Sequence, residues 1–571
     1  MGSELGLSPE SGNTARLDGL GIFYIVLSAV WSILLLSGAA YLVAHRDSQV
    51  VRARGLLLPL GGVFFLHLYW VSVQLGYVLG PLYPGDAEYW IMGTYFPFGI
   101  ALFHAGNSRF LYVAEGQRRF VDGRMMEGKE GKEGAVTAAP AAHPPANTGG
   151  VKGLLARFKK LDHTRKVFVL VGTGMVFQIL VTILMYVLSR KWHSSWGIKG
   201  TEARGDDEAE RKINMGRGWE WWHTVFWQFF WAWVVAPLVL WKSRGIRDTQ
   251  GWRLQTVGCC IASLHATPMW LIALYVPGME KVNEYFIPPQ WIAVSIMVLE
   301  IFTIFIPVNE VRRSANLCKV SLDSIAQWES RNHGRKTVQH VTLGDKNGDL
   351  TPPASPRRTS FHSHSQESIL TLGALEHVLE RNPGPLLEFS ALRDFSGENI
   401  AFLTSVGHWK ANFPKILTGD LVRDRYNQAL RIYAAYVGVH DAEFQVNLPS
   451  SILRRLEAAF EGPARVVFGA KETDPATPFA GLERTGSGGS GTSTSSPSSD
   501  DSSEKTVVAG AGGADDGVLG GKIQFWGEIP TEFNAKVFDE AEANVKYLVL
   551  TNTWPKFVRE RRSSMDSLET A

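Results

Sequence analysis

The sequence predicts an all-α protein, in which a seven-transmembrane helix bundle is followed by a soluble cytosolic helical bundle. Apolar runs recur through the first 313 of its 571 residues, whereas the remainder is mixed and in places strongly polar. Most of the 19 tryptophans fall in the first part, as is typical of membrane proteins with aromatic side chains at the lipid interface. The second part lacks the Val/Ile-rich alternation of β-strands, so we expect helices there too.

Composition argues against several classes of protein. The formal net charge of +2 argues against a general nucleic-acid binder, so no nucleic-acid partner is expected. Three cysteines, Cys259, Cys260 and Cys318, are too few for a disulfide framework. The sequence shows no convincing motif for a cofactor or a metal ion, and we expect neither.

Seven segments are long and apolar enough to be transmembrane helices, which need about 20 mostly apolar residues. They lie at residues 20–44, 56–79, 89–114, 167–189, 221–241, 255–276 and 291–308. A multi-pass membrane protein is therefore predicted, with the lipid bilayer as a partner.

The charges of the loops predict the orientation, because Lys and Arg favour the cytosolic side. Basic loops follow the first, third, fifth and seventh segments, as at Arg52, Arg119 and Arg247. The loop after the second segment contains Asp86 and Glu88 and no basic residue, and the mixed loop at 190–218 does not decide. We therefore expect the N-terminus, residues 1–18, outside the cell and the soluble part in the cytosol.

Several polar or ionisable residues lie inside the predicted spans, and three of them are candidates for a functional site. Glu300 is near the middle of the seventh segment, and His104 and His265 lie within the third and sixth. Such groups are costly at membrane depth and usually face the interior of a bundle. We interpret them as a candidate transmembrane site for an extracellular small ligand or a proton. The alternative is a hydrogen bond between helices that only fixes their packing.

Composition also divides the chain beyond the membrane part, residues 19–313. We expect a disordered linker at 314–368, a soluble helical domain at 369–560 with a disordered Ser/Gly-rich insertion at about 464–522, and a polar tail at 561–571. Two Arg-Arg tetrapeptides, which end at Ser360 and Ser564, match sites for a basophilic kinase. Phosphorylation there would add negative charge to a basic patch.

Apolar residues at helical spacing predict the helices of the soluble domain. Leu375, Val378 and Leu379 share one face of a first helix, which Pro383 and Gly384 end. Further helices are expected at 399–413, 421–437, 452–460 and 537–550.

The soluble domain carries four motifs in a fixed order. They are Leu392-Arg-Asp-Phe-Ser-Gly-Glu-Asn-Ile-Ala-Phe402, Ile432-Tyr-Ala-Ala-Tyr-Val437, Val446-Asn-Leu448, and the pair Phe538-Asp-Glu-Ala541 and Trp554-Pro-Lys-Phe557. In this order they closely resemble the family of regulators of G-protein signalling (RGS), which implies an RGS-type helical bundle. A seven-span part joined to such a domain resembles hybrids of plants and filamentous fungi.

Three positions depart from the family pattern. Leu403 stands where the family usually has Trp, which we interpret as a change in the core. Asn552 replaces the usual acidic residue, and Lys556 replaces the usual Arg. The exchange at Asn552 is expected to weaken Gα binding or to alter which Gα is chosen.

The resemblance implies a protein that accelerates GTP hydrolysis on Gα subunits and so terminates heterotrimeric G-protein signalling at the plasma membrane. It is not itself an enzyme, because Gα supplies its own arginine and glutamine, and the domain binds the transition-state arrangement of the switch loops most tightly. The implied partner is the GTP-bound or transition-state form of Gα. The implied Gα-binding residues are Ser396, Glu398, Asn399, Asn447, Leu448, Leu548, Asn552, Thr553 and Lys556.

Other interpretations stay open. The chain could be a transporter or channel-like membrane protein whose cytosolic domain is a non-activating scaffold. It could also be a receptor that both activates a G protein and ends the signal. At the level of single residues, Ser396 could simply cap a helix, and Asn447 could simply end a loop.

Overall fold

The computed structural model describes residues 14–83, 86–122, 163–193, 195–206, 208–342, 370–414, 419–438, 442, 444–468 and 524–569. The chain divides into two compact units: Met1–Glu115 with Ala156–Arg313, and Gly116–Leu155 with Ser314–Ala571. Helices form the regular structure, and within the described ranges the β pairing is limited to one bridge between Ser189 and Ile198. The predicted all-α class is confirmed for these residues.

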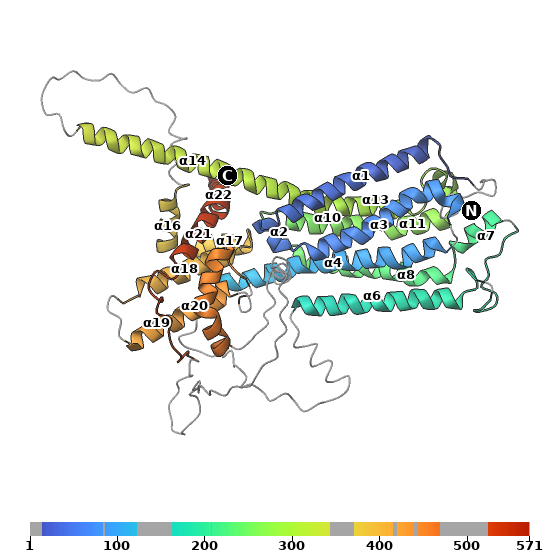
Figure 1. Ribbon diagram of the computed structural model, residues 1–571. Helices are drawn as coiled ribbons and strands as arrows, with labels where there is room; N and C mark the ends of the chain where they lie inside the picture. The colour runs from blue at the N-terminus through green and yellow to red at the C-terminus, as the bar shows by residue number, and fades with distance from the viewer. Residues whose placement is uncertain are drawn as a thin grey trace, which may run out of the picture. The chain divides into compact units, whose positions relative to one another are not determined.

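Unit 1 is built from long helices that lie side by side (Figure 1). The long helices and their continuations are α1 (Gly19–Ala44), α3 (Leu57–Leu79), α4 (Ala87–Val121), α6 (His163–Leu188), α8 (Trp222–Phe229), α9 (Ala236–Ser243), α10 (Trp252–Leu264), α11 (Ala266–Tyr275), α13 (Gln290–Glu300) and α14 (Ile306–Thr342). The end of α4 from Gly116 and the part of α14 from Ser314 belong to unit 2. Short elements are α2 (Gln49–Arg54), η1 (Gly80–Leu82), α7 (Glu208–Met215), η2 (Trp219–Trp221), η4 (Pro277–Met279) and α12 (Glu280–Asn283). Two π-helical turns, η3 (Phe230–Val235) and η5 (Ile301–Phe305), continue α8 into α9 and α13 into α14.

Among the described residues, six helical stretches are long and apolar enough to cross a membrane. They are Gly19–Ala44, Leu57–Leu79, Lys166–Leu188, Trp219–Ser243, Trp252–Tyr275 and Gln290–Gln327. The third predicted segment, 89–114, is helical within α4 but is not one of the six. Its buried polar side chains, among them His104, Asn107 and Arg109, make it less apolar than the other segments. Six of the seven predicted segments therefore lie in candidate membrane helices.

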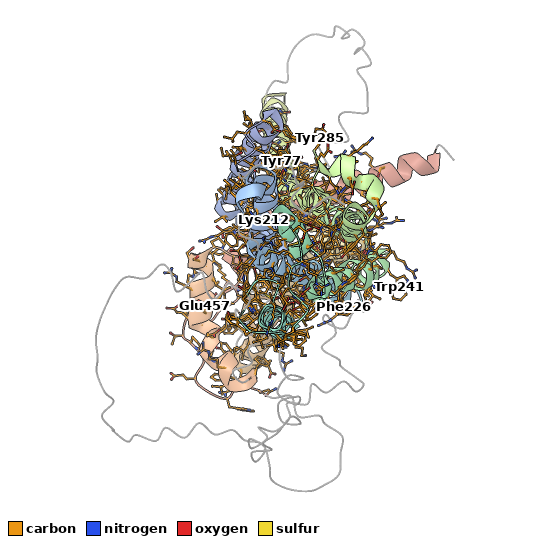
Figure 2. All side chains as sticks on the ribbon, turned by 90° about the vertical axis from the view of Figure 1, so that its right-hand side faces the viewer. Tyr77, Lys212, Phe226, Trp241, Tyr285 and Glu457 are labelled. Carbon is orange, nitrogen blue, oxygen red and sulfur yellow. The ribbon has the colours of Figure 1, made fainter. Side chains whose placement is uncertain are left out.

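Exposed apolar side chains on these helices fit a lipid environment. The side chains of Ile33 on α1, Leu170 on α6 and Phe226 on α8 are 67%, 67% and 70% exposed. Phe226 and Trp241 lie at the edge of the bundle (Figure 2). So many large apolar side chains this exposed are unusual on a protein that faces water on all sides.

Aromatic residues and paired amides fill the interior of unit 1. Trp70, Tyr69 and Trp270 are almost completely buried in one apolar cluster. Gln74 on α3 and Gln290 on α13 exchange two hydrogen bonds of 3.0 and 3.1 Å. Because both amides satisfy each other, they fix the packing of the two helices without leaving a buried polar group unpaired.

Unit 2 contains the helices of the soluble domain. They are α16 (Leu372–Arg381), α17 (Gly384–Leu392), α18 (Gly397–Ala411), α19 (Gly419–Ile432), η6 (Tyr433–Val437), α20 (Ser450–Phe468), α21 (Asp539–Leu548), η7 (Val549–Thr553) and α22 (Trp554–Glu569). Its core is aromatic: the rings of Phe402, Phe460 and Phe538 contact one another or shared neighbours, and all three side chains are 0% exposed. Leu403 is buried beside them, as the sequence predicts.

Several boundaries differ from the sequence-based prediction. The linker expected at 314–368 is helical up to Thr342, and the tail expected at 561–571 continues α22 to Glu569. Helix α20 runs through Pro463 to Phe468, and helix α17 was not predicted. The rest of the linker, Ser360 included, and most of the predicted insertion lie outside the described residues.

Candidate functional site

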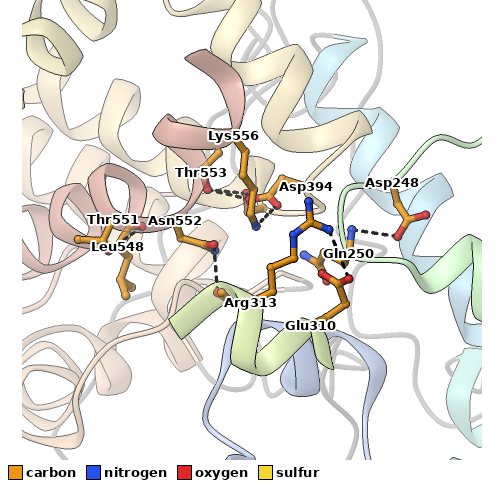
Figure 3. Close-up of polar contacts among 12 residues, drawn as sticks. Asp248, Gln250, Glu310, Arg313, Asp394, Leu548, Thr551, Asn552, Thr553 and Lys556 are labelled. Atoms are coloured by element: carbon orange, nitrogen blue, oxygen red, sulfur yellow. Dashed lines mark hydrogen bonds and ion pairs between the residues drawn. The ribbon is translucent and has the colours of Figure 1, made fainter. Parts of the chain in front are cut away.

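The carboxylate of Asp394 organises the site. It lies in the loop between α17 and α18 and is 0% exposed. It accepts hydrogen bonds from Ser396 Oγ (3.1 Å), from Thr553 Oγ1 (2.8 Å) and from Lys556 Nζ (2.7 Å). Figure 3 shows Thr553 and Lys556 directed at Asp394. Asp394 therefore joins two segments that are about 160 positions apart: the loop before α18, and η7 with the start of α22.

The loop before α18 is held in a tight conformation. Ser396 N–H donates to Ser390 O (2.8 Å), and Asn399 N–H donates to Ser396 O (3.1 Å). Phe395 has φ +51°, in the left-handed region that bulky residues rarely adopt. Backbone strain of this kind costs about 1–3 kcal/mol and is kept where surrounding contacts enforce it, often at functional sites.

Ser396 is the N-cap residue of α18, but its side chain makes no capping hydrogen bond. Its hydroxyl instead bonds Asp394 and lies 3.3 Å from Thr553 Oγ1. Ser396 is therefore the N-cap residue by position, but the interpretation that its side chain caps the helix is wrong.

Three of the nine predicted Gα-binding residues, Ser396, Asn399 and Thr553, are buried. Glu398, Asn447, Leu448, Leu548, Asn552 and Lys556 are half-buried. Asn447 and Leu448 lie in the segment before α20, which is tied to η6 by Val446 N–H donating to Tyr436 O (2.9 Å). The structure brings Ser396, Thr553 and Lys556 together through Asp394.

Two predicted site residues form hydrogen bonds to other helices of unit 2: one bonds to the end of α4 and the other to α14. The four residues involved all belong to unit 2. Glu398 Oε2 accepts a hydrogen bond from Gln117 Nε2 (2.9 Å), and Asn552 Oδ1 accepts one from Ser314 Oγ (3.3 Å). Neither Asp394 nor Gln117 was predicted. Asp394 lies inside the first RGS-like motif and could have been noticed there, whereas Gln117 has no sequence signal, because it follows an apolar run far from the motifs.

The predicted transmembrane residues do not gather at one site. Glu300 accepts hydrogen bonds from Trp31 Nε1 (2.6 Å) and pairs with His67 Nδ1 (2.9 Å). His104 stacks on Trp231 instead, and neither of its ring nitrogens has a hydrogen-bond partner. His265 joins α10 to α11 and shares no hydrogen bond with Glu300 among the contacts of the described chain.

The polar groups around Asp394 and Gln117 are hydroxyls, amides, the Lys556–Asp394 ion pair and the Glu398 carboxylate. Across the described ranges, no group of three His, Cys, Asp or Glu side chains is placed to hold a metal ion. All three cysteines are free. Ser564 lies in α22, near the end of the chain.

In comparisons with known proteins, no family model, no curated protein and no solved structure matches this chain.

Proposed function

We propose that the chain is a membrane-anchored GTPase-activating protein, which accelerates GTP hydrolysis on Gα subunits and terminates heterotrimeric G-protein signalling. The proposal rests on the RGS-like motifs, and one observation supports it above all. Asp394 joins the loop that carries Ser396, Glu398 and Asn399 to the segment that carries Asn552, Thr553 and Lys556. Residues that the resemblance assigns to one binding surface are thus held together.

The proposed mechanism needs no catalytic residue in this chain. A Gα subunit supplies an arginine in cis and a glutamine that orients the attacking water. The proposed surface binds the switch loops most tightly in their transition-state arrangement, and each factor of ten in rate requires about 1.4 kcal/mol of such differential binding. Asn447 would hydrogen-bond between the switches, and Glu398 would accept hydrogen bonds from one of them.

The candidate membrane helices explain why such a domain would be attached to a bundle. In the part of the chain that the structure describes, six helices are long and apolar enough to cross a membrane. Gα subunits work at the plasma membrane, so an anchored domain meets them at a raised effective concentration without any new contact. We place the domain on the cytosolic face. Because Glu300, His104 and His265 lie apart, the proposal assigns no ligand pocket to them.

The test is single-turnover GTP hydrolysis by a Gα subunit with increasing amounts of the full chain in lipid nanodiscs. We expect acceleration that saturates, and we expect Asn447→Ala to weaken it about tenfold or more, because a buried hydrogen-bonding group of the complex loses its partner.

Asn412→Ala is the matched control. The Asn412 amide is exposed at the end of α18 and donates only to His408 O of the same helix, so the variant should behave as wild type. Absence of acceleration at saturating concentration, with several Gα classes and a folded chain, would contradict the proposal. So would acceleration that survives Asn447→Ala.

A further inference from the structure

The end of α4 lies against the proposed Gα-binding surface. Gln117 Oε1 accepts a hydrogen bond from Gly397 N–H (2.9 Å), and Gln117 Nε2 donates to Glu398 Oε2 (2.9 Å). The Gln117 side chain therefore bonds both the Gly397 N–H and one carboxylate oxygen of Glu398. Both groups belong to the loop that, by the resemblance, contacts the switch loops of Gα. All of these residues belong to unit 2.

The same helix end also reaches the second predicted contact loop. Phe120 packs against Phe444, with ring centroids 5.7 Å apart and planes at 69°. Phe444 is three positions before Asn447. Gln117 and Phe120 are three residues apart on one helix, so they share a face. One helix face thus contacts the loop of Glu398 and the loop of Asn447, and both side chains are 1% exposed.

Glycine permits this close approach. The Phe444 ring packs so tightly on Gly116 that a Cβ atom there would overlap it. A Cβ atom on Gly397 would come within 2.8 Å of Gln117 Oε1. Both contacts are closer than ordinary side chains tolerate, so the helix end is fitted to this surface.

One group on the surface is left unsatisfied. Asn399 Oδ1 is buried and has no hydrogen-bond partner. A buried acceptor without a partner is costly, and such groups call for an explanation. The helix end covers this surface but does not satisfy all of its hydrogen-bonding groups. This is expected where a segment of the same chain occupies a binding site in place of the partner.

We propose that the end of α4 is an autoinhibitory segment, which covers the Gα-binding surface and must withdraw before Gα binds. This inference rests on the proposed function. The Gly397 N–H is already donated to Gln117 Oε1, and the Gln117 amide lies on Glu398 Oε2, so a switch loop that bonds these atoms has to displace the Gln117 side chain. Because α4 is one continuous helix, a shift of the helix removes Gln117 and Phe120 together.

Competition of this kind has a defined kinetic signature. The fraction of chains with an open surface scales the apparent affinity for Gα but leaves the fully bound complex unchanged. Release of the α4 end therefore lowers the concentration of chain that gives half-maximal acceleration. The maximal rate stays the same.

Two variants release the helix end in different ways. Gln117→Glu replaces the donor to Glu398 with a carboxylate, so two like charges would lie side by side. Gly116→Ala leaves every contact residue in place, adds a Cβ atom against Phe444, and favours the helix. Val121→Ala is the control, because the Val121 side chain is 37% exposed at the same helix end.

The assay is the Gα titration in nanodiscs described above, together with amide hydrogen exchange of residues 396–399. We expect Gln117→Glu and Gly116→Ala to lower the half-maximal concentration about tenfold with an unchanged plateau. We also expect faster exchange at Gly397. Val121→Ala should match wild type.

The outcomes separate the two proposals. If wild type accelerates hydrolysis and both variants give the same half-maximal concentration, the autoinhibitory segment is wrong and the proposed function stands. If neither the wild type nor the folded variants accelerate hydrolysis at any concentration, the proposed function is wrong, and the inference falls with it.

Discussion

Asp394 combines a charge, complete burial and hydrogen bonds from Ser396, Thr553 and Lys556, the last two across a large sequence separation. Its ion pair with Lys556 is nearly buried, with side chains that are 0% and 17% exposed. A buried carboxylate is stable only while its partners are in place. Asp394 is therefore a positioning residue for the proposed surface, and Lys556 is held by it.

We expect Asp394→Asn to destabilise unit 2 by about 2–4 kcal/mol, because the Lys556 ammonium loses its counter-charge. The readout is urea dependence of amide exchange in α18 and α22. Glu540→Gln is the control, since the Glu540 side chain is 53% exposed in its pair with Arg455. The double variant Asp394→Asn, Lys556→Met should recover part of the loss, because it removes both charges. Equal loss in the double variant would exclude the ion pair as the cause.

At single positions, the sequence predicts which residues belong to the proposed surface better than it predicts the contacts that hold them. The motif around Ser396 and Glu398 was found from residue types in order. Its dependence on Asp394 was not, because hydrogen bonds between residues about 160 positions apart have no local signal. The same holds for Glu300: the sequence suggests His104 or His265 as its partner, whereas the structure pairs it with His67.

Between elements, a charged cluster joins α18 to α21. Lys410 on α18 bonds Asp539 and Glu542 on α21, and Lys546 bonds Glu542 and Glu376. Burial raises the pKa of Glu542, but the hydrogen bonds from Lys410 and Lys546 outweigh it, so the pKa lies below its ordinary value. The Glu542 side chain is only 14% exposed, which makes this pairing stronger than a surface ion pair.

Acid should weaken this junction. A carboxylate with a lower pKa in the folded state adds stability that is complete above its unfolded pKa and is lost as pH falls through the folded pKa. The ordinary pKa is 4.5, so amide protection of α18 and α21 should fall as the pH drops below about that value. Glu542→Gln should flatten this fall and cost about 1–2 kcal/mol at neutral pH.

The control for that variant lies on the same helix. Glu540 pairs with Arg455, and the two side chains are 53% and 66% exposed. Glu540→Gln should change stability by less than about 0.5 kcal/mol, because exposed ion pairs contribute little. If Glu542→Gln and Glu540→Gln changed the pH dependence of amide protection equally, the buried pairing of Glu542 would contribute no more stability than the exposed pairing of Glu540.

Helix existence was predictable, and helix ends were not. Apolar spacing predicted α16, α18, α19, α20 and α21 in the right order. Helix α17 was missed because Pro383 and Gly384 were interpreted only as a stop, whereas Pro near a helix start also begins the next helix. Helices α14 and α22 continue past their apolar stretches into polar sequence, where hydrophobic periodicity gives no signal.

At the scale of the whole molecule, the number of membrane crossings decides which face the soluble domain occupies. Within the described ranges, six stretches qualify by length and apolarity, and α4 does not. Yet α4 has 35 residues, and at about 1.5 Å per residue it is about 52 Å long, more than a bilayer core requires. Its residues Tyr89, Phe96 and Phe103 lie in the buried cluster of unit 1. A helix surrounded by other helices tolerates polar side chains that lipid would exclude.

With α4 as a seventh span, the chain crosses an odd number of times, and its two ends lie on opposite sides. On that topology, the positive-inside rule predicts an N-terminus outside the cell from the basic loops. We expect Thr14→Cys to react with a membrane-impermeant maleimide on intact cells, and Arg454→Cys to react only after permeabilisation; both side chains are exposed. Wild type is the control for Cys259, Cys260 and Cys318, two of which are buried. Reaction of both variants on the same side would mean an even number of crossings. In that case α4 would not cross the membrane, and the soluble domain would lie on the same side as the N-terminus. The domain could then meet cytosolic Gα only if the N-terminus were also in the cytosol.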